Sequence, residues 1–244
     1  MTLDRPRTHE SVLRHVENEL STGRLRIGDK LPGERTLATQ LGLSRPSIRE
    51  AIRVLEAMGI VRTSVGSGPD AGAVIVADAS TGITATLRLH LASSHLPIFD
   101  IVQTRVLLEA WCAREAANRQ DAEQLAVAEA LLDAMDAPGL AAEEFHPLDA
   151  EFHVTLARAA GNQVVAAIMT SLREAINQYV LVAVPLLPDW TATARRLRRQ
   201  HRNVLAAVRA GDGERAAHLV VRHIDGFYRE APLEPTDTIT GRAS

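Results

Sequence analysis

The segment spanning residues 31–60 constrains this chain most strongly, because it has the pattern of two short helices joined by a tight turn. Leu37 and Leu41 lie one turn apart, and Gly42 follows where a helix end favours a left-handed residue. Ser44 then suits the N-cap of a second helix. The spacing therefore predicts a helix-turn-helix.

The second predicted helix has two distinct faces. At about 100° per residue, one arc of roughly 80° holds the apolar residues Ile48, Ala51, Leu55 and Met58. A separate arc of similar width holds Arg45, Arg49 and Arg53. The apolar face can pack on a small core, and guanidinium groups on the other face can meet guanine O6 and N7 in a major groove. An arginine stripe is more often just a solvated face, so the interpretation depends on the residues after the helix.

A predicted hairpin comes directly after this helix. Gly59 ends the helix, residues 61–65 form a predicted strand, residues 66–72 supply turn residues, and residues 73–76 form a returning strand. A helix-turn-helix with a hairpin after it is a winged helix, which favours DNA binding.

Residues 9–77 resemble the DNA-binding domain of the GntR superfamily of bacterial transcription regulators. The residues that carry the resemblance are Gly28-Asp29, Leu31-Pro-Gly-Glu-Arg35, Leu37-Ala38, Leu41-Gly-Leu-Ser-Arg45, Ile48-Arg-Glu-Ala51, Leu55 and Gly59-Ile60. The resemblance implies operator contacts from Arg35, Ser44, Arg45, Ser47 and Arg49, with Gly66 of the wing in the minor groove. The wing departs from the usual short turn of this family by the extra Pro69-Asp-Ala-Gly72.

Composition limits the class of protein. A length of 244 residues allows two domains, and a single cysteine, Cys112, excludes an intrachain disulfide and fits a reducing cytoplasm. No apolar run approaches the ~18 residues that span a membrane. Residues 1–77 hold eleven basic and nine acidic residues, and the remainder holds sixteen and twenty-one. The asymmetry has the sign expected for DNA binding but is small.

The second half of the chain is helical. Short breaks separate seven predicted helices, at about 80–93, 98–118, 121–136, 141–160, 163–183, 190–210 and 213–230. Short loops between long helices predict an all-α antiparallel bundle. We therefore expect a mainly α protein with a winged helix at 1–77, a bundle at 78–231 and a disordered tail at 232–244.

One group of residues in the bundle could bind a metal. Asp149 and His153 are four residues apart and share a helix face, while His201 and His223 lie in later helices. If these four converged they would suit Zn²⁺, with Ni²⁺ or Mn²⁺ as alternatives. Such a pair is also common by chance, and the other histidines are interpreted as surface or helix-end residues, namely His9, His15, His90, His95, His146 and His218.

The same half resembles the C-terminal FCD domain of the FadR branch of GntR regulators. The match rests on residues 149–162 with Asp149 and His153, on residues 201–217 after His201, on His223, and on Arg105-Val-Leu-Leu-Glu109. The resemblance implies the metal-binding type, in which these four ligands hold a cation and a small carboxylate completes its coordination. It also implies that Arg105 pairs with that carboxylate, whereas an intrahelical pair with Glu109 is the alternative.

The expected function is that of a DNA-binding regulator with a sensor domain. The resemblance implies a homodimer that reads an inverted repeat in double-stranded DNA, responds to a small carboxylate and acts as a repressor in the cytoplasm. A metal-dependent hydrolase is the alternative, because a cation with an open position can activate water. No side chain of obvious placement serves as its general base, which favours the sensor.

Overall fold

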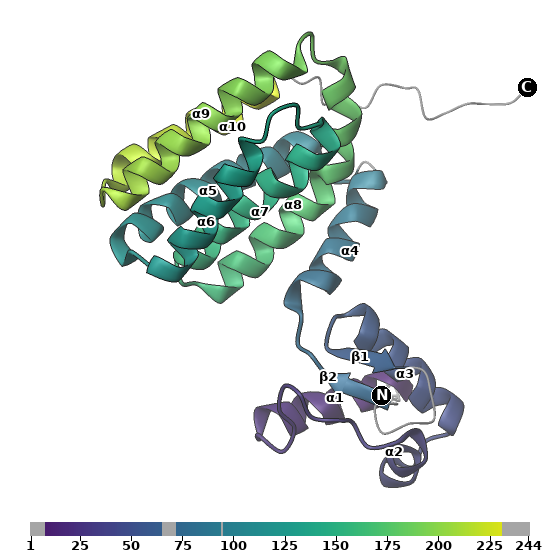
Figure 1. Cartoon of the computed structure of the whole chain (residues 1–244). Helices are drawn as coiled ribbons and strands as arrows, with labels where there is room; N and C mark the ends of the chain where they lie inside the picture. The colour runs from purple at the N-terminus through teal and green to yellow at the C-terminus, as the bar shows by residue number, and fades with distance from the viewer. Residues whose placement is uncertain (1–7, 65–71, 94, 231–244) are drawn as a thin grey trace, which may run out of the picture. The chain divides into compact units, whose positions relative to one another are not determined.

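The computed structural model describes residues 8–64, 72–93 and 95–230, and the chain divides into two compact units after Ile83. The first unit is a winged helix, as Figure 1 shows. Its elements are α1 (Thr8–Ser21), α2 (Glu34–Leu41), α3 (Arg45–Ala57), β1 (Val61–Ser64) and β2 (Gly72–Ile75). The predicted wing residue Gly66 lies outside the described residues.

The turn between α2 and α3 has the predicted chemistry. Gly42 caps α2 in the left-handed conformation, at φ 65° and ψ 30°. The Ser44 hydroxyl oxygen accepts the Ser47 backbone N–H at 3.3 Å and so caps α3. These two caps end one helix and begin the next within three residues, which fixes the angle at which α3 leaves α2.

The apolar face of α3 packs inward with one exception. Ile48, Ala51 and Leu55 are buried, but Met58 is 45% exposed. The prediction that Met58 joins the apolar face was wrong, because α3 ends at Ala57 and Met58 is its C-cap. Gly59 then turns the chain with φ 73°.

The wing is a two-stranded antiparallel hairpin that completes the small core. Val61 pairs with Ile75 and Ser64 with Gly72, and a further bridge joins Lys30 to Val74. The inward residues of the hairpin pack against α1 and α3, so the core consists mainly of Val12, Val16, Leu31, Leu37, Ile48, Leu55, Val61 and Ile75. This core leaves the arginine face of α3 on the outside.

The second unit is a helical bundle, and seven α-helices occur after residue 77 in the described residues, as predicted. They are α4 (Ala79–Ala92), α5 (Ile98–Arg119), α6 (Ala122–Met135), α7 (Ala142–Ala159), α8 (Gln163–Ala183), α9 (Trp190–Arg209) and α10 (Gly213–Glu230). A 3-10 turn, η1 (Val184–Leu186), fills the proline-rich break before α9. The helix ends lie within two residues of the predicted ones, because glycine, proline and capping residues mark them.

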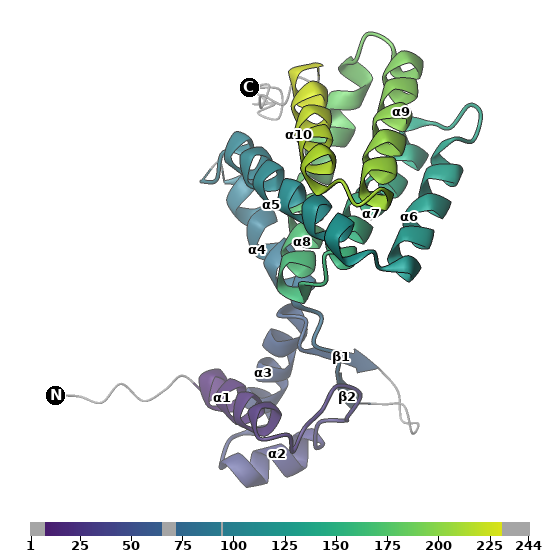
Figure 2. The same cartoon turned by 90° about the vertical axis from the view of Figure 1, so that its left-hand side faces the viewer.

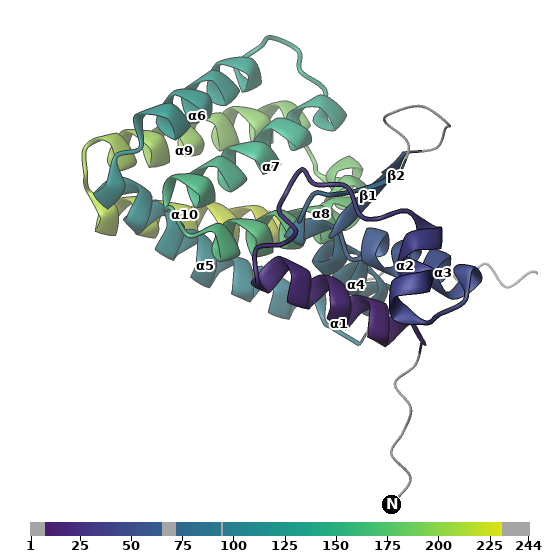
Figure 3. The same cartoon turned by 90° about the horizontal axis from the view of Figure 1, so that it is seen from below.

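The helices of the bundle surround two apolar clusters, and the larger one forms the main core. α5 packs on α7 and α10, α7 also packs on α6 and α8, and α9 packs on α10. Figure 2 shows α9 beside α10, and Figure 3 shows α5, α7 and α6 in succession. The largest fully buried side chains in this core are Leu132, Met135, Phe145, Phe152 and Ile224. This packing turns one face of α7, α9 and α10 toward a shared interior.

The boundary between the two compact units falls after Ile83, inside the residue range of α4 and six residues beyond the boundary predicted at residue 77. The first turn of α4 belongs to the winged helix, since Gly82 packs on the backbone of Met58 and the Asp78 N–H donates to the Gly59 carbonyl at 2.7 Å. Among the described residues, we found no helix with the length and apolar character needed to cross a membrane. The predicted tail at 232–244 lies outside the described residues.

Replacing Gly59 with alanine should destabilise the winged helix strongly. A Cβ at Gly59 would lie 2.1 Å from the Asp78 carbonyl oxygen, whereas Gly23 has the same φ of 73° and open space around it. We expect Gly23→Ala to lower the free energy of unfolding by about 1 kcal/mol and Gly59→Ala by about 3 kcal/mol or more. Urea unfolding followed by circular dichroism measures both, and equal losses would contradict the close approach at Gly59.

Candidate functional site

Four side chains from three helices lie together inside the second unit. Asp149 and His153 project from α7, His201 from α9 and His223 from α10. One ligand atom from each lies within 4.8 Å of the others. We call these four residues the ligand cluster. They are the four candidate metal ligands predicted from the sequence.

The cluster is arranged around one carboxylate oxygen. His201 Nε2 lies 3.1 Å from Asp149 Oδ1 and 3.1 Å from His223 Nε2. His153 Nε2 lies 3.9 Å from the same Asp149 oxygen. All three imidazoles therefore turn their Nε2 atoms toward a common point.

Two of the imidazoles are oriented by contacts at their other nitrogen. His153 Nδ1 lies 2.5 Å from Glu109 Oε2 on α5, and His223 Nδ1 lies 3.0 Å from Gln200 Oε1 on α9. A contact of this kind at Nδ1 fixes the ring and leaves Nε2 free to bind a cation. The four-residue spacing on α7 places Asp149 and His153 on the same side of that helix.

Charge and burial shift the pKa values of Asp149, His153 and His223. Burial favours a raised pKa for Asp149, but Arg173 and the nearby histidines outweigh it and hold the pKa well below its ordinary value. Burial lowers the pKa of His153, and burial together with the neighbouring imidazoles lowers the pKa of His223 well below its ordinary value. A carboxylate beside neutral imidazoles is the form in which these groups bind cations.

The cluster fits a divalent cation. The Nε2 atom of His153 and the Nδ1 atom of His201 are buried without a hydrogen-bond partner. A buried polar atom without a partner is costly, and a cation among the four ligand atoms would bind the unpartnered His153 Nε2. Three nitrogens and one carboxylate oxygen suit Zn²⁺, and the same donors accept Ni²⁺ or Mn²⁺.

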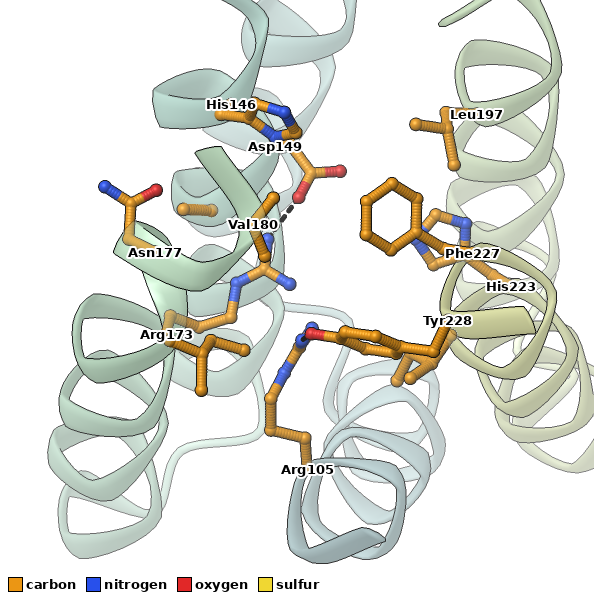
Figure 4. A pocket seen from close by; sticks show the side chains of 13 residues that line it. Arg105, His146, Asp149, Arg173, Asn177, Val180, Leu197, His223, Phe227 and Tyr228 are labelled. Carbon is orange, nitrogen blue, oxygen red and sulfur yellow. Dashed lines mark hydrogen bonds and ion pairs between the residues drawn. The ribbon is translucent and has the colours of Figure 1, made fainter. Parts of the chain in front are cut away.

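A pocket opens beside the cluster. It holds about 490 Å³ of space between side chains, part of it open to solvent. Figure 4 shows that its polar wall combines groups from α5, α7, α8 and α10, among them Arg105, His146, Asp149, Arg173, His223 and Tyr228. The apolar wall contains Ile176, Val180, Leu197 and Phe227. A small polar ligand in this pocket would contact the cluster at Asp149 and His223.

Arg105 lines this pocket and also makes the intrahelical pair that was its alternative role. Its Nε donates to Glu109 Oε1 at 2.9 Å, and its Nη1 donates to the Tyr228 hydroxyl. Arg105 and Glu109 are both buried, and their opposite charges lower the pKa of Glu109 despite its burial. The two roles are compatible, because a guanidinium has five N–H donors and these contacts do not use them all.

Sequence reasoning missed two residues of the site. Arg173 on α8 is buried and forms an ion pair with Asp149 Oδ2, yet its only sequence signal is a charge within an apolar helix. The interpretation of His146 as a surface or helix-end residue was wrong, since His146 is 5% exposed and lines the pocket. Its position three residues before Asp149 on the same helix was a usable signal.

The first unit presents the predicted DNA-reading residues at its surface. Arg35, Arg45 and Arg49 are exposed, and Ser44 and Ser47 lie at the N-terminus of α3 with their hydroxyl oxygens 2.8 Å apart. Arg49 is held by Glu34 of α2, through Nε to Oε1 at 3.0 Å and Nη2 to Oε2 at 2.9 Å. The guanidinium of Arg49 is therefore ordered on the outer face of α3.

Comparisons with known proteins agree with both units. Residues 8–69 match the model described as "Bacterial regulatory proteins, gntR family", and residues 100–226 match "FCD domain". The "Glc operon transcriptional activator" of Escherichia coli (strain K12) is 30% identical over 82% of this chain and 79% of its own length. The "Putative L-lactate dehydrogenase operon regulatory protein" of the same strain is 28% identical over 89% of this chain and 84% of its own length.

A solved structure supports the same relationship. The structure titled "Streptococcus agalactiae GntR" superposes with a TM-score of 0.69 at 26% identity, covering 92% of this chain and all of that one. The matching domains and relatives are transcription regulators and not enzymes, so the hydrolase alternative is set aside. The chain belongs to the GntR family of bacterial transcription regulators, with a winged helix followed by an FCD domain.

Proposed function

We propose that this regulator binds an inverted-repeat operator as a homodimer and that a small carboxylate, bound beside a divalent cation in the FCD domain, changes its affinity for that operator. The observation that carries the proposal is the ligand cluster, which opens onto a pocket lined by two buried arginines. Its DNA partner implies that the protein acts in the cytoplasm.

The DNA-binding half of the proposal rests on α3. Its exposed Arg45 and Arg49 can reach guanine edges in a major groove, and Arg35 lies at the start of α2. The hydroxyls of Ser44 and Ser47 lie where helix N-termini meet phosphates. A single winged helix offers few such contacts, so two copies on a palindrome are needed for tight binding.

The sensing half rests on the cluster and the pocket. When bound, a divalent cation such as Zn²⁺ supplies an electrophilic position for a carboxylate oxygen. Asp149, His153, His201 and His223 would hold it. Arg105 would bind the same effector with the N–H donors that Glu109 and Tyr228 leave free.

Coupling between effector binding and DNA binding requires that the effector binds one arrangement of the bundle more tightly than another. Helix α4 begins in the first unit and ends in the second, so the chain connects the two units through this helix. We propose repression as the output, because a dimer that covers a promoter blocks polymerase without further contacts. The matched relatives include an activator from Escherichia coli and a repressor from Cronobacter sakazakii.

Selection on random double-stranded oligonucleotides tests the proposal directly. We expect the full chain to enrich a short inverted repeat, and we expect small carboxylates to change the affinity for it when metal is bound. Enrichment of a single half-site without symmetry would contradict the dimer. Affinity that no carboxylate changes in the metal-loaded protein would contradict the sensor.

Replacing Arg49 with alanine should weaken binding to the selected operator by about 1–3 kcal/mol. The reason is the loss of a guanidinium that can meet a base edge, and specificity at that base should relax. Fluorescence anisotropy on operator and random DNA measures both effects. Arg14→Ala is the matched control, since it removes an exposed arginine of α1. Equal losses on operator and random DNA would show that Arg49 meets only phosphate.

Replacing His223 with alanine should remove the bound metal, because it deletes one of the four ligands. His218→Ala is the matched control, since His218 is exposed on the same helix and lies outside the cluster. Elemental analysis of the purified proteins measures the metal content. Full occupancy in the His223 variant would place the metal elsewhere, and metal loss in the His218 variant would contradict the site as described.

A further inference from the structure

The pocket beside the ligand cluster contains two buried arginines. Arg105 reaches it from α5 and Arg173 from α8, and both are less than a tenth exposed. Figure 4 shows their guanidinium groups converging on the pocket from different helices. The proposed function uses one of them, Arg105. The role of the second is open.

The two guanidinium groups differ in how fully their donors are used. Arg105 donates through Nε and Nη2 to Glu109 and through Nη1 to Tyr228. Arg173 donates through Nη2 to Asp149, and its Nη1 lies 3.9 Å from Glu109, beyond hydrogen-bond distance. Arg173 therefore keeps more of its fork for a ligand than Arg105 does.

The charges of the site balance only when no cation is bound. Arg105 and Arg173 carry two positive charges, and Glu109 and Asp149 carry two negative charges against them. Histidines bind cations as neutral imidazoles, so they add no charge. A bound divalent cation therefore leaves two uncompensated positive charges in a buried site. Such charges are costly unless a partner of opposite sign is present.

We propose that the effector is a small dicarboxylate and that Arg173 binds its second carboxylate. This inference rests on the proposed function. A monocarboxylate would leave one of the two excess charges uncompensated, whereas a dicarboxylate neutralises both. The apolar wall, which contains Ile176, Val180 and Leu197, suits the short carbon chain between two carboxylates. Arg173 is thus a specificity-determining residue for the length and charge of the effector.

Two matched acids test this inference. Malate and 2-hydroxybutyrate share a four-carbon chain and the 2-hydroxy acid, and they differ in a terminal carboxylate against a methyl group. Isothermal titration of the metal-loaded full chain should give an affinity for malate about tenfold higher or more, because a charged hydrogen-bond pair is gained. Equal affinity for the two acids, or no binding of malate, would overturn the inference.

Variants at residue 173 assign the preference to that side chain. Arg173→Met should remove the preference for malate, so that the two acids bind with equal affinity to samples matched for metal content. Arg173→Lys keeps the positive charge but lacks the forked N–H donors of the guanidinium, so it should retain part of the preference for malate. This variant replaces the methionine variant if that one folds poorly. Arg114→Met is the control, since Arg114 pairs with Glu214 on the surface of the same bundle. A preference for malate that stays at the wild-type level in either folded Arg173 variant would overturn the assignment.

Metal content measured on the same samples separates the two levels of the proposal. A wild-type protein that cannot be loaded with metal contradicts the proposed function and the charge argument built on it. A fully loaded protein that binds the two acids equally contradicts the dicarboxylate inference alone. A fully loaded protein that prefers malate through Arg173 supports both.

Discussion

The carboxylate of Asp149 connects the two halves of the buried polar site. Its Oδ1 faces His201 and His153, and its Oδ2 accepts a hydrogen bond from Arg173. A carboxylate that is largely removed from solvent is costly without such partners, so the bundle tolerates Asp149 only where α8 and α9 bring them. The charge balance of the site therefore depends on how these helices are arranged, and neither can change without the other.

Glu109 extends this network to a fourth helix, α5. It pairs with Arg105 on its own helix and lies against His153 of α7, and Arg105 in turn bonds to Tyr228 of α10. These buried ion pairs and hydrogen bonds join groups from different helices, and a shared polar network of this kind favours one packing of the helices. The proposed cation and anionic effector would change the charges inside it, which would give the bundle a physical reason to respond to them. That response is what a sensor domain requires.

The winged helix uses charge in a different way, at its surface. Glu34 binds the fork of Arg49 in the absence of DNA, and Arg45 lies 3.9 Å from the same carboxylate. Exposed pairs of this kind contribute little to stability. Their effect is on geometry, because Glu34 holds Arg49 on the outer face of α3. In the proposed operator complex, DNA bases or phosphates would compete with Glu34 for that guanidinium.

The amino-acid sequence by itself determined the helix-turn-helix, the seven helices after residue 77 and the placement of Asp149 and His153 on one helix face. Helical periodicity, glycine and proline breaks and the four-residue spacing of Asp149 and His153 all act within one segment, so they can be identified without a structure. The family resemblance added His201 and His223, which spacing alone left open. Only the tertiary structure decided the partners of Arg173, the burial of His146 and the exposure of Met58. The reason is physical: these depend on which helices meet and where each one stops, and no spacing within a single helix specifies that.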